Sequence, residues 1–385
     1  MSRFLSHCRM IAALVGFLKI LIIWFTPVIV ESDFWNWTMG ASLVLNTVLA
    51  GRFPALSSFG VYVGILAILA PFFWLWTILP VEHPPLPNLV SHTAPAISLA
   101  LVMKLPIFLC DILAGILVFR MVREITHSER SGTIAFLAWF ANPYNLYWLY
   151  VFGSMDILPT ALVLLAVLFG MNSRWVRCGF LTTIAGLLRV APFAALPFFL
   201  PLTKTRSTRN RLLLGAFFPV ACLIGLLFAT TADTLATIVE APLRQGWLLA
   251  FLGDNITGGG QFAKLTPVLM IIQLYVVLWY WKSNPNIVHL TSVSFLALLL
   301  GATLYGGSFQ HFIWVSPLLS ASVALHPEES WIFVLTFVTA SLSPPVYPIN
   351  QWIPAREILD PFLAAAFYAM KATYLVRLNL WNLKP

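Results

Sequence analysis

Two carboxylates, Glu31 and Asp33, stand directly after the first long apolar run of the chain. A charged side chain in lipid is costly unless water, a partner or a substrate compensates for its lost hydration. A carboxylate at the end of a membrane span could act as a general base that takes a proton from an acceptor hydroxyl. An acidic helix end beside the anchoring tryptophans Trp35 and Trp37 explains the same residues without chemistry. Position alone leaves both interpretations open.

A second pair of ionisable residues, Lys104 and Asp111, lies within the apolar segment 98–119. The two residues are about two helical turns apart, so their side chains share one face of the predicted helix. Ionisable residues on a membrane span usually face the bundle interior and find partners there. Locking of the bundle is therefore the simpler interpretation for Asp111. Lys104, nearer the outer end, could instead contact an anionic lipid head group.

A third group of polar residues surrounds a proline in the next apolar segment. Asn142-Pro143 interrupts this segment, and Asp156 opens the one after it. Proline removes a backbone donor, and neighbouring polar side chains can satisfy the carbonyl that this frees. We expect a kinked helix that lines a cavity, with Asp156 as the N-cap of the next helix.

A lone arginine and two histidines complete the candidates. Arg189 lies between two short apolar segments and has no acidic neighbour in the sequence. This position favours contact of its guanidinium group with a phosphate over a distant ion pair with Asp111. Gln310 and His311 lie in a loop, where the histidine could serve as an acid, as a donor to sugar or phosphate, or as a solvated residue. His83 is similarly ambiguous. P-loops, zinc motifs, nucleophile elbows and dinucleotide fingerprints are absent from the sequence, so no metal-ligand set is predicted.

The composition is that of a membrane protein. Hydrophobic residues make up 60% of the 385 residues and charged residues 9%, whereas soluble domains carry about 25% charged residues. At about 20 residues a span, the chain has room for ten to thirteen helical spans. The sequence therefore predicts an all-α polytopic membrane protein, organised as one domain over 1–385. The net charge of +8 is not a nucleic-acid footprint, because most of the 22 Lys and Arg residues form short clusters between apolar runs.

These basic clusters also predict the topology. If all of them are cytoplasmic, an even number of spans must separate each from the next, the first segment is a retained signal anchor, and both termini are cytoplasmic. The predicted pairs are 10–30 with 98–119, 132–151 with 156–171, the short 178–188 with 191–203, 212–231 with 264–281, 287–306 with 309–325, and 331–349 with 361–376. This topology leaves two large outer loops, 31–97 and 233–263. Within the first loop, 40–57 and 58–80 are expected to be interfacial or re-entrant helices, and a pair of membrane spans in their place would also preserve the parity.

Taken in order, these residues resemble a known family. The matching motifs are Glu31-Ser-Asp33, Gly51-Arg52-Phe-Pro54, His83-Pro-Pro-Leu, Lys104 with Asp111, Asn142-Pro143, Gly153-Ser-Met-Asp156, Arg189-Val-Ala-Pro192 and the aromatic-rich Phe309–Pro317. They resemble the GT-C superfamily of integral-membrane glycosyltransferases that use polyprenyl-phosphate sugars. The resemblance is greatest to the mannosyltransferase branch that contains the catalytic subunit of GPI mannosyltransferase I and its prokaryotic relatives. It covers about 300 residues and rests on the order of individually weak motifs.

The resemblance implies an inverting transfer of a hexose, with mannose expected, from a polyprenyl (dolichyl-type) phosphate to a lipid-linked glycan or glycolipid on the non-cytoplasmic face. Asp33, with Glu31, would be the catalytic carboxylate. Arg189, Lys104 and His311 would contact the donor phosphate. The residues expected to bind substrate or to support the site are Arg52, His83, Asp111, Asn142, Asp156 and Gln310. Membrane lipids and a small membrane accessory subunit are the further partners that this family implies.

Two departures from the family pattern bear on mechanism. The acidic motif is Glu31-x-Asp33 in place of Asp-x-Asp, which leaves the requirement for a divalent cation open, and 58–80 resembles an insertion. Two other functions compete with glycosyl transfer. A non-catalytic glycolipid-binding subunit like the U subunit of GPI transamidase would share the Asp111 and Asn142 motifs, and a lipid or sugar transporter would place its ionisable residues near mid-membrane.

Overall fold

The computed structural model describes residues 2–25, 33–49, 63–83, 93–188, 192, 195–200, 202–230, 313–314, 316–325, 327 and 330–331. Within these ranges every regular element is helical and no strand is present, which confirms the all-α prediction for this part of the chain. Two of these helices are long and apolar enough to cross a membrane, over Ser6–Phe25 and Ala94–Thr126. Four predicted spans, 264–281, 287–306, 331–349 and 361–376, and the loop 233–263 lie outside the described residues apart from Trp331.

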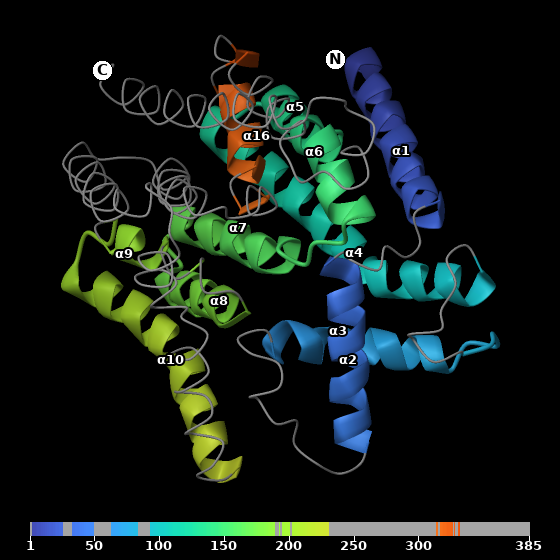
Figure 1. Ribbon diagram of the computed structural model, residues 1–385. Helices are drawn as coiled ribbons and strands as arrows, with labels where there is room; N and C mark the ends of the chain where they lie inside the picture. Colours follow the sequence, from blue (N-terminus) through green and yellow to red (C-terminus); the bar gives the residue numbers. More distant parts are fainter. Residues whose placement is uncertain are drawn as a thin grey trace, which may run out of the picture.

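The described elements form a helical assembly with α1 standing at its edge (Figure 1). In chain order they are α1 (Ser2–Phe25), α2 (Asp33–Leu49), α3 (Val63–Thr77), α4 (Ala94–Thr126), α5 (Glu129–Phe140), α6 (Pro143–Asn145), the π-helix η4 (Leu146–Val151), α7 (Ile157–Met171), α8 (Trp175–Leu188), α9 (Leu196–Phe199), α10 (Arg206–Thr230) and α16 (Ser316–Leu325). The predicted 98–119 is extended at both ends in α4. Of the predicted short segment 191–203 the structure describes residues 192, 195–200 and 202–203, and among these α9 is the one α-helix.

A tight reversal joins α4 to α5. His127 takes a left-handed conformation with φ of 53° and donates its backbone N–H to Arg123 O, while the Ser128 side chain caps α5 by accepting from Ser131 N. The two helices then pack antiparallel along their length. Gly132 lies against Phe119 near the reversal, and Trp139 Nε1 donates to Asp111 O farther away. A Cβ at position 132 would overlap this ring, so the glycine permits the close approach.

The proline interruption divides the predicted segment 132–151, as expected. Helix α5 ends at Phe140, and Asn142 Oδ1 then accepts from Tyr144 N at 3.0 Å to start the short helix α6. The chain continues as the π-helix η4 before it reaches α7. A π-helix inserts an extra residue into a helical turn and is frequent at functional sites.

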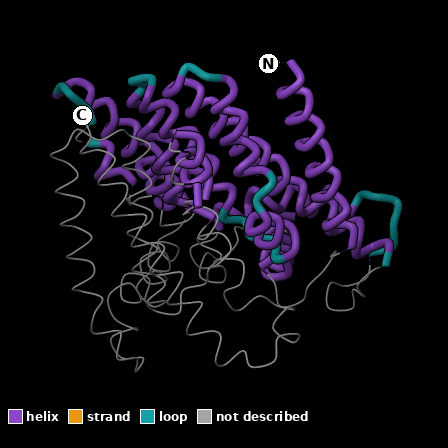
Figure 2. The backbone as a smooth tube through the Cα atoms, turned by 90° about the horizontal axis from the view of Figure 1, so that it is seen from above, coloured by secondary structure: helices purple, strands orange, loops and turns teal. Residues whose placement is uncertain are grey.

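Helix α1 lies antiparallel to α4 at the edge of the described assembly. Its first half shares a pocket with Phe119 near the carboxyl end of α4, and its second half reaches Asp111 through Lys19. Much of its apolar surface remains exposed, for example at Leu14, Phe17 and Phe25. Seen from above, α1 again stands beside the other helices and not among them (Figure 2). This arrangement suits a span that faces lipid on one side.

Helices α2 and α3 occupy the predicted first outer loop, with bounds that differ from the expected 40–57 and 58–80. They pack on one another, and Trp76 Nε1 of α3 donates to Ser98 Oγ near the amino end of α4 at 3.0 Å. With 17 and 15 residues, both are shorter than the roughly 20 residues of a full span. Their lengths are those expected of interfacial or re-entrant helices, and their placement in the bilayer stays a prediction.

The closest helix crossing described lies between α8 and α10. Gly179 of α8 lies against the backbone of Leu212 and Ala216, and Gly215 of α10 lies against the backbone of Val176. A Cβ at either glycine would overlap main-chain atoms that cannot rotate away. Small residues at such crossings let membrane helices approach closely and gain packing energy.

We therefore expect Gly179→Ala to lower the free energy of unfolding by about 1–3 kcal/mol, because the added methyl forces α8 and α10 apart. Gly16→Ala in α1 is the matched control, since a Cβ at that position meets nothing within 4 Å. The control should be neutral or stabilising by up to about 1 kcal/mol, owing to the higher helix propensity of alanine. Unfolding of both variants in detergent micelles measures the difference, and equal stability would contradict the close crossing.

Candidate functional site

A buried ion pair joins α1 to α4. Lys19 Nζ of α1 is 2.5 Å from Asp111 Oδ2 of α4, and both side chains are 0% exposed. It is the one ion pair among the described residues. Two charges so far from water are stable only when they are paired and further hydrogen-bonded.

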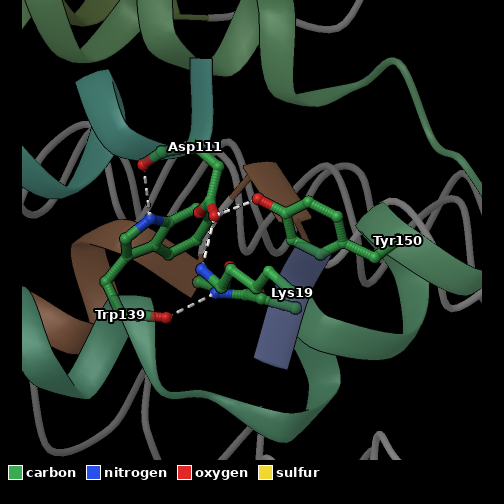
Figure 3. Close-up of polar contacts among 6 residues, drawn as sticks. Lys19, Asp111, Trp139 and Tyr150 are labelled. Carbon is green, nitrogen blue, oxygen red and sulfur yellow. Dashed lines mark hydrogen bonds and ion pairs between the residues drawn. The ribbon is translucent and has the colours of Figure 1, made fainter. Parts of the chain in front are cut away.

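Additional contacts surround both members of the pair (Figure 3). Tyr150 of η4 donates its hydroxyl to Asp111 Oδ2 at 2.5 Å, and Trp139 of α5 donates its indole N–H to the backbone oxygen of Asp111 at 3.1 Å. The Lys19 ammonium lies 3.3 Å from the centroid of the Phe140 ring. A desolvated cation over an aromatic face gains about 2 kcal/mol, which offsets part of its burial cost.

Lys104 joins the same cluster from one side. Its ammonium donates to the backbone oxygen of Tyr150 at 2.6 Å, and the residue is only 1% exposed. Tyr150 lies in the last turn of η4, where main-chain carbonyls lack a helical donor. Lys104 and Asp111 therefore share one face of α4, as predicted, and both contact Tyr150. The role predicted for Lys104 at a donor phosphate stays a prediction, and its described contact is with main chain.

The cluster extends to α16 through a second set of polar contacts. Asn145 of α6 donates its amide to Trp139 O at 2.9 Å, and its Oδ1 accepts from Ser316 of α16 at 3.2 Å. Both residues are 0% exposed. We call Lys19, Lys104, Asp111, Trp139, Asn145, Tyr150 and Ser316 the polar core. It joins six elements that are far apart in the sequence.

Two buried polar atoms next to these contacts have no hydrogen-bond partner among the described residues, Asp111 Oδ1 and Asn142 Nδ2. Since a buried polar group normally finds a partner, each atom has capacity for one further interaction, such as a water molecule. Asn142 was predicted to bind substrate or to support the site. Its Oδ1 caps α6, which is a supporting contact.

Asp156 differs from its predicted capping role. It occupies the N-cap position of α7, but its side chain makes no capping hydrogen bond and its backbone is already helical, with φ of −62° and ψ of −14°. An N-cap side chain accepts from the backbone when its own residue is extended, which this conformation prevents. The prediction of a side-chain cap is therefore wrong. Its backbone oxygen accepts from Thr160 Oγ1 at 2.6 Å instead.

His83 lies in the exposed segment after α3. Its Nε2 is 3.0 Å from Leu79 O, and its ring contacts Trp76 edge-on with centroids 4.6 Å apart. These contacts hold the segment against α3. The other predicted site residues, Glu31, Arg52, Arg189, Gln310 and His311, lie outside the described residues, and of Asp33 the structure describes the backbone, at the first position of α2.

The described elements have one end rich in arginine, which we call the arginine end, with residues from three helices and from the turn before a fourth. These residues are Arg9 of α1, Arg120 and Arg123 of α4, Arg130 of α5 and Arg174 just before α8. The Arg130 guanidinium lies 5.3 Å from the centroid of Phe4, and Asn172 donates to Glu124 Oε2 at 3.2 Å. These contacts place the starts of α1 and α5 beside the carboxyl ends of α4 and α7.

The positions of the described site residues along the bundle are set by this arrangement. Helices α1 and α5 begin at the arginine end and run away from it. Asp33, which follows α1, and Asn142, which follows α5, therefore lie away from the arginines. Helices α4 and α7 end at the arginine end, so Lys104 in the first half of α4 and Asp156 at the start of α7 also lie away from it. Lys104 is about 24 Å along α4 from Arg120, at about 1.5 Å for each residue. Among the described candidates, Lys104, Asn142, Asp156 and the backbone of Asp33 thus lie toward the end away from the arginines.

No metal cluster of three or more His, Cys, Asp or Glu residues occurs within the described ranges. Comparison with protein-family models, with curated proteins and with solved structures finds no match for this chain. The resemblance to polyprenyl-phosphate-dependent glycosyltransferases therefore continues to rest on the order of the motifs.

Sequence reasoning named Lys104 and Asp111 and missed the other five members of the polar core, Lys19, Trp139, Asn145, Tyr150 and Ser316. The sequence did carry one signal for Lys19, since it is the sole charged residue of the apolar run 10–30. A single cation within a membrane span usually pairs with a buried anion, and Asp111 on the next predicted span was the first candidate for that partner. Tyr150 gave no comparable signal, because tyrosine is frequent near the ends of membrane spans.

We expect Lys19→Met and Asp111→Asn each to lower the free energy of unfolding by about 3–5 kcal/mol, because each leaves one charge or polar group buried without its partner. The double variant Lys19→Met/Asp111→Asn removes both charges and retains an acceptor for the Tyr150 hydroxyl. It should be clearly more stable than either single variant. Unfolding measurements in micelles provide the double-mutant cycle, and strictly additive losses would show that the pair is not coupled.

Proposed function

We propose that this protein is an inverting glycosyltransferase of the GT-C type. It moves a hexose, mannose in the first instance, from a polyprenyl phosphate to a glycolipid or lipid-linked acceptor on the non-cytoplasmic face of the membrane. The observation that carries the proposal is the separation along the bundle: Asp33 comes after α1 at the end away from the arginines. Positive residues mark the cytoplasmic ends of membrane helices, so the opposite end is the side where the donor would react.

The chemistry requires a base, a leaving group and a place for the lipid. Asp33 takes the proton of the acceptor hydroxyl while that oxygen attacks the anomeric carbon from the face opposite the phosphate. The bond from the anomeric carbon to the phosphate oxygen breaks, and the polyprenyl phosphate leaves as an anion. Positive groups near the phosphate stabilise the charge that develops on it, and Arg189 and His311 are the residues proposed for this task.

The polar core supports the proposal as a scaffold. Lys104 and Asp111 both hold Tyr150, which lies six residues before Asp156 and close to the turn that begins α7. This arrangement fixes the carboxyl end of η4 against the central part of α4. Fixed geometry matters because a small misplacement of reacting groups lowers the rate strongly.

The exposed apolar surfaces of α1 and α4 support a membrane location. On α4, the exposed residues Leu105, Leu109, Leu113 and Ile116 recur at helical spacing on one side. A stripe of this kind would be unfavourable in water and suits contact with acyl chains. A polyprenyl donor could enter from the bilayer along such a surface.

We expect Asp33→Asn to lower the rate of sugar transfer by at least about 100-fold, since a positioned general base contributes about 100- to 10,000-fold. Glu82→Gln is the matched control, because Glu82 is an exposed carboxylate at the same end and is assigned no role. The assay supplies purified protein in lipid nanodiscs with polyprenyl-phosphate mannose, glucose or galactose and a glycolipid extract as acceptor. Consumption of the donor and labelling of the extract are measured.

Three outcomes of this assay decide between the candidate functions. Transfer that is lost in Asp33→Asn and retained in Glu82→Gln supports the enzyme. Equal activity of wild type and Asp33→Asn contradicts the role of Asp33. Binding of the glycolipid extract without consumption of any donor would favour a non-catalytic glycolipid-binding subunit.

The proposed orientation makes a separate prediction about accessibility. Glu82 and Glu129 are both exposed, and they lie toward opposite ends of α4. In a cysteine-free background, Glu129→Cys should react with a membrane-impermeant maleimide only after the membrane is opened, and Glu82→Cys should react in intact cells. Labelling of both positions from the same side would contradict the orientation.

A further inference from the structure

We propose that a pocket at the arginine end binds the phosphate of an anionic phospholipid in the cytoplasmic leaflet. The pocket has a volume of about 250 Å³ and lies where α4, the end of α7 and the start of α8 meet. Its polar lining consists of Arg120, Arg123, Glu124, Asn172 and Arg174. The proposal depends on a membrane location and is independent of glycosyl transfer.

The walls of the pocket are held in place by hydrogen bonds. Asn172 Nδ2 donates to Glu124 Oε2 at 3.2 Å and so ties the end of α7 to α4. Ser173 has a left-handed conformation with φ of 56°, and Arg174 N donates to Phe169 O at 2.8 Å. This tight turn brings Arg174 to the same pocket as the two arginines of α4. The arrangement is therefore built by the fold and is more than a chance gathering of surface charges.

The charge of the pocket is unbalanced. Three arginines and one carboxylate line the pocket, and none of the three arginines forms an ion pair within the described part of the chain. The single carboxylate, Glu124, already accepts from Asn172. A guanidinium group can hold a phosphate with two parallel hydrogen bonds, so an anion with several oxygens suits this lining.

The apolar part of the lining favours a lipid as the source of the phosphate. Leu168 and Phe169 complete the pocket, and the guanidinium groups of Arg174 and Arg177 lie 6.0 and 5.4 Å from the centroid of the Phe169 ring. Cations poised over an apolar wall are the arrangement found at the head-group level of a bilayer. Basic pockets between membrane helices on the cytoplasmic side bind anionic head groups for this reason.

The test compares two triple variants with equal loss of charge. Arg120→Gln/Arg123→Gln/Arg174→Gln removes the pocket's arginines. Arg206→Gln/Arg209→Gln/Arg211→Gln removes three arginines of α10 that do not line it. Each purified protein is titrated in phosphatidylcholine nanodiscs with dioleoylphosphatidylglycerol. The shift in unfolding temperature and native mass spectrometry report bound lipid.

We expect the pocket variant to bind phosphatidylglycerol at least about tenfold more weakly than wild type, because charge-assisted contacts are lost. The α10 variant should stay within about twofold of wild type. Equal losses in the two variants, or no loss in either, would overturn the proposal, since binding would then be diffuse or elsewhere.

Two further arms address the source of the phosphate and the integrity of the variants. If sn-glycerol 1-phosphate stabilises the protein as well as the lipid does, with the same dependence on the pocket's arginines, the ligand is a soluble phosphate and the lipid assignment is wrong. If only polyglutamate does so, the pocket binds an acidic protein and the proposal is again wrong.

The variant Arg120→Lys/Arg123→Lys/Arg174→Lys keeps the charge that orients the helices. If the glutamine variant fails to insert, this lysine variant decides: binding weakened by at least about threefold supports the proposal, and unchanged binding overturns it.

Discussion

The contact between Lys19 and Asp111 determines how the first helix joins the rest of the described structure. Apolar contacts between helices in a bilayer have little advantage over contacts with lipid, so they specify position only weakly. Helix α1 leaves much of its apolar surface exposed, and its one charged residue within the apolar run is the residue that meets α4. Burial of an unpaired charge would be prohibitive, which restricts α1 to the register and rotation that bring the ammonium to the carboxylate. The specificity of this docking comes from electrostatics.

The polar core and the arginine end lie at different levels along the bundle and have different roles. The polar core joins α1, α4, α5, α6, η4 and α16 in the interior, where hydrogen bonds to buried groups are directional and therefore restrictive. The arginine end carries positive charge that forms no ion pair within the described ranges, and we propose that it binds an anionic head group. The backbone of the candidate residue Asp33, at the start of α2, lies beyond the interior cluster from these arginines. The two proposals, transfer from a lipid phosphate and recognition of a lipid phosphate, therefore concern opposite ends of the described helices.

Much of the described helical pattern could be predicted from the sequence, because apolar length and basic clusters are local properties. The break at Asn142-Pro143 and the helical assignment of 98–119 came from such signals and are confirmed. The partner of Asp111 could not be derived with the same ease, since Lys19 lies 92 residues away and sequence spacing carries no distance between helices. Asp156 was placed correctly at a helix start, but its backbone conformation, which forbids capping, is set by the preceding turn. For Asp33, the first position of α2 is consistent with the predicted acidic helix end, and its chemistry stays a prediction.

The π-helix η4 has a consequence for the tolerance of this segment to insertion and deletion. Because successive helical residues are about 100° apart around the axis, loss of one residue between Leu146 and Val151 would convert the wide turn to a normal one and rotate the downstream residues by that angle. Tyr150 could then no longer present its carbonyl to one cation and its hydroxyl to the carboxylate at the same time. We therefore expect insertions and deletions between Leu146 and Val151 to be far rarer among homologues than amino-acid substitutions in the same segment.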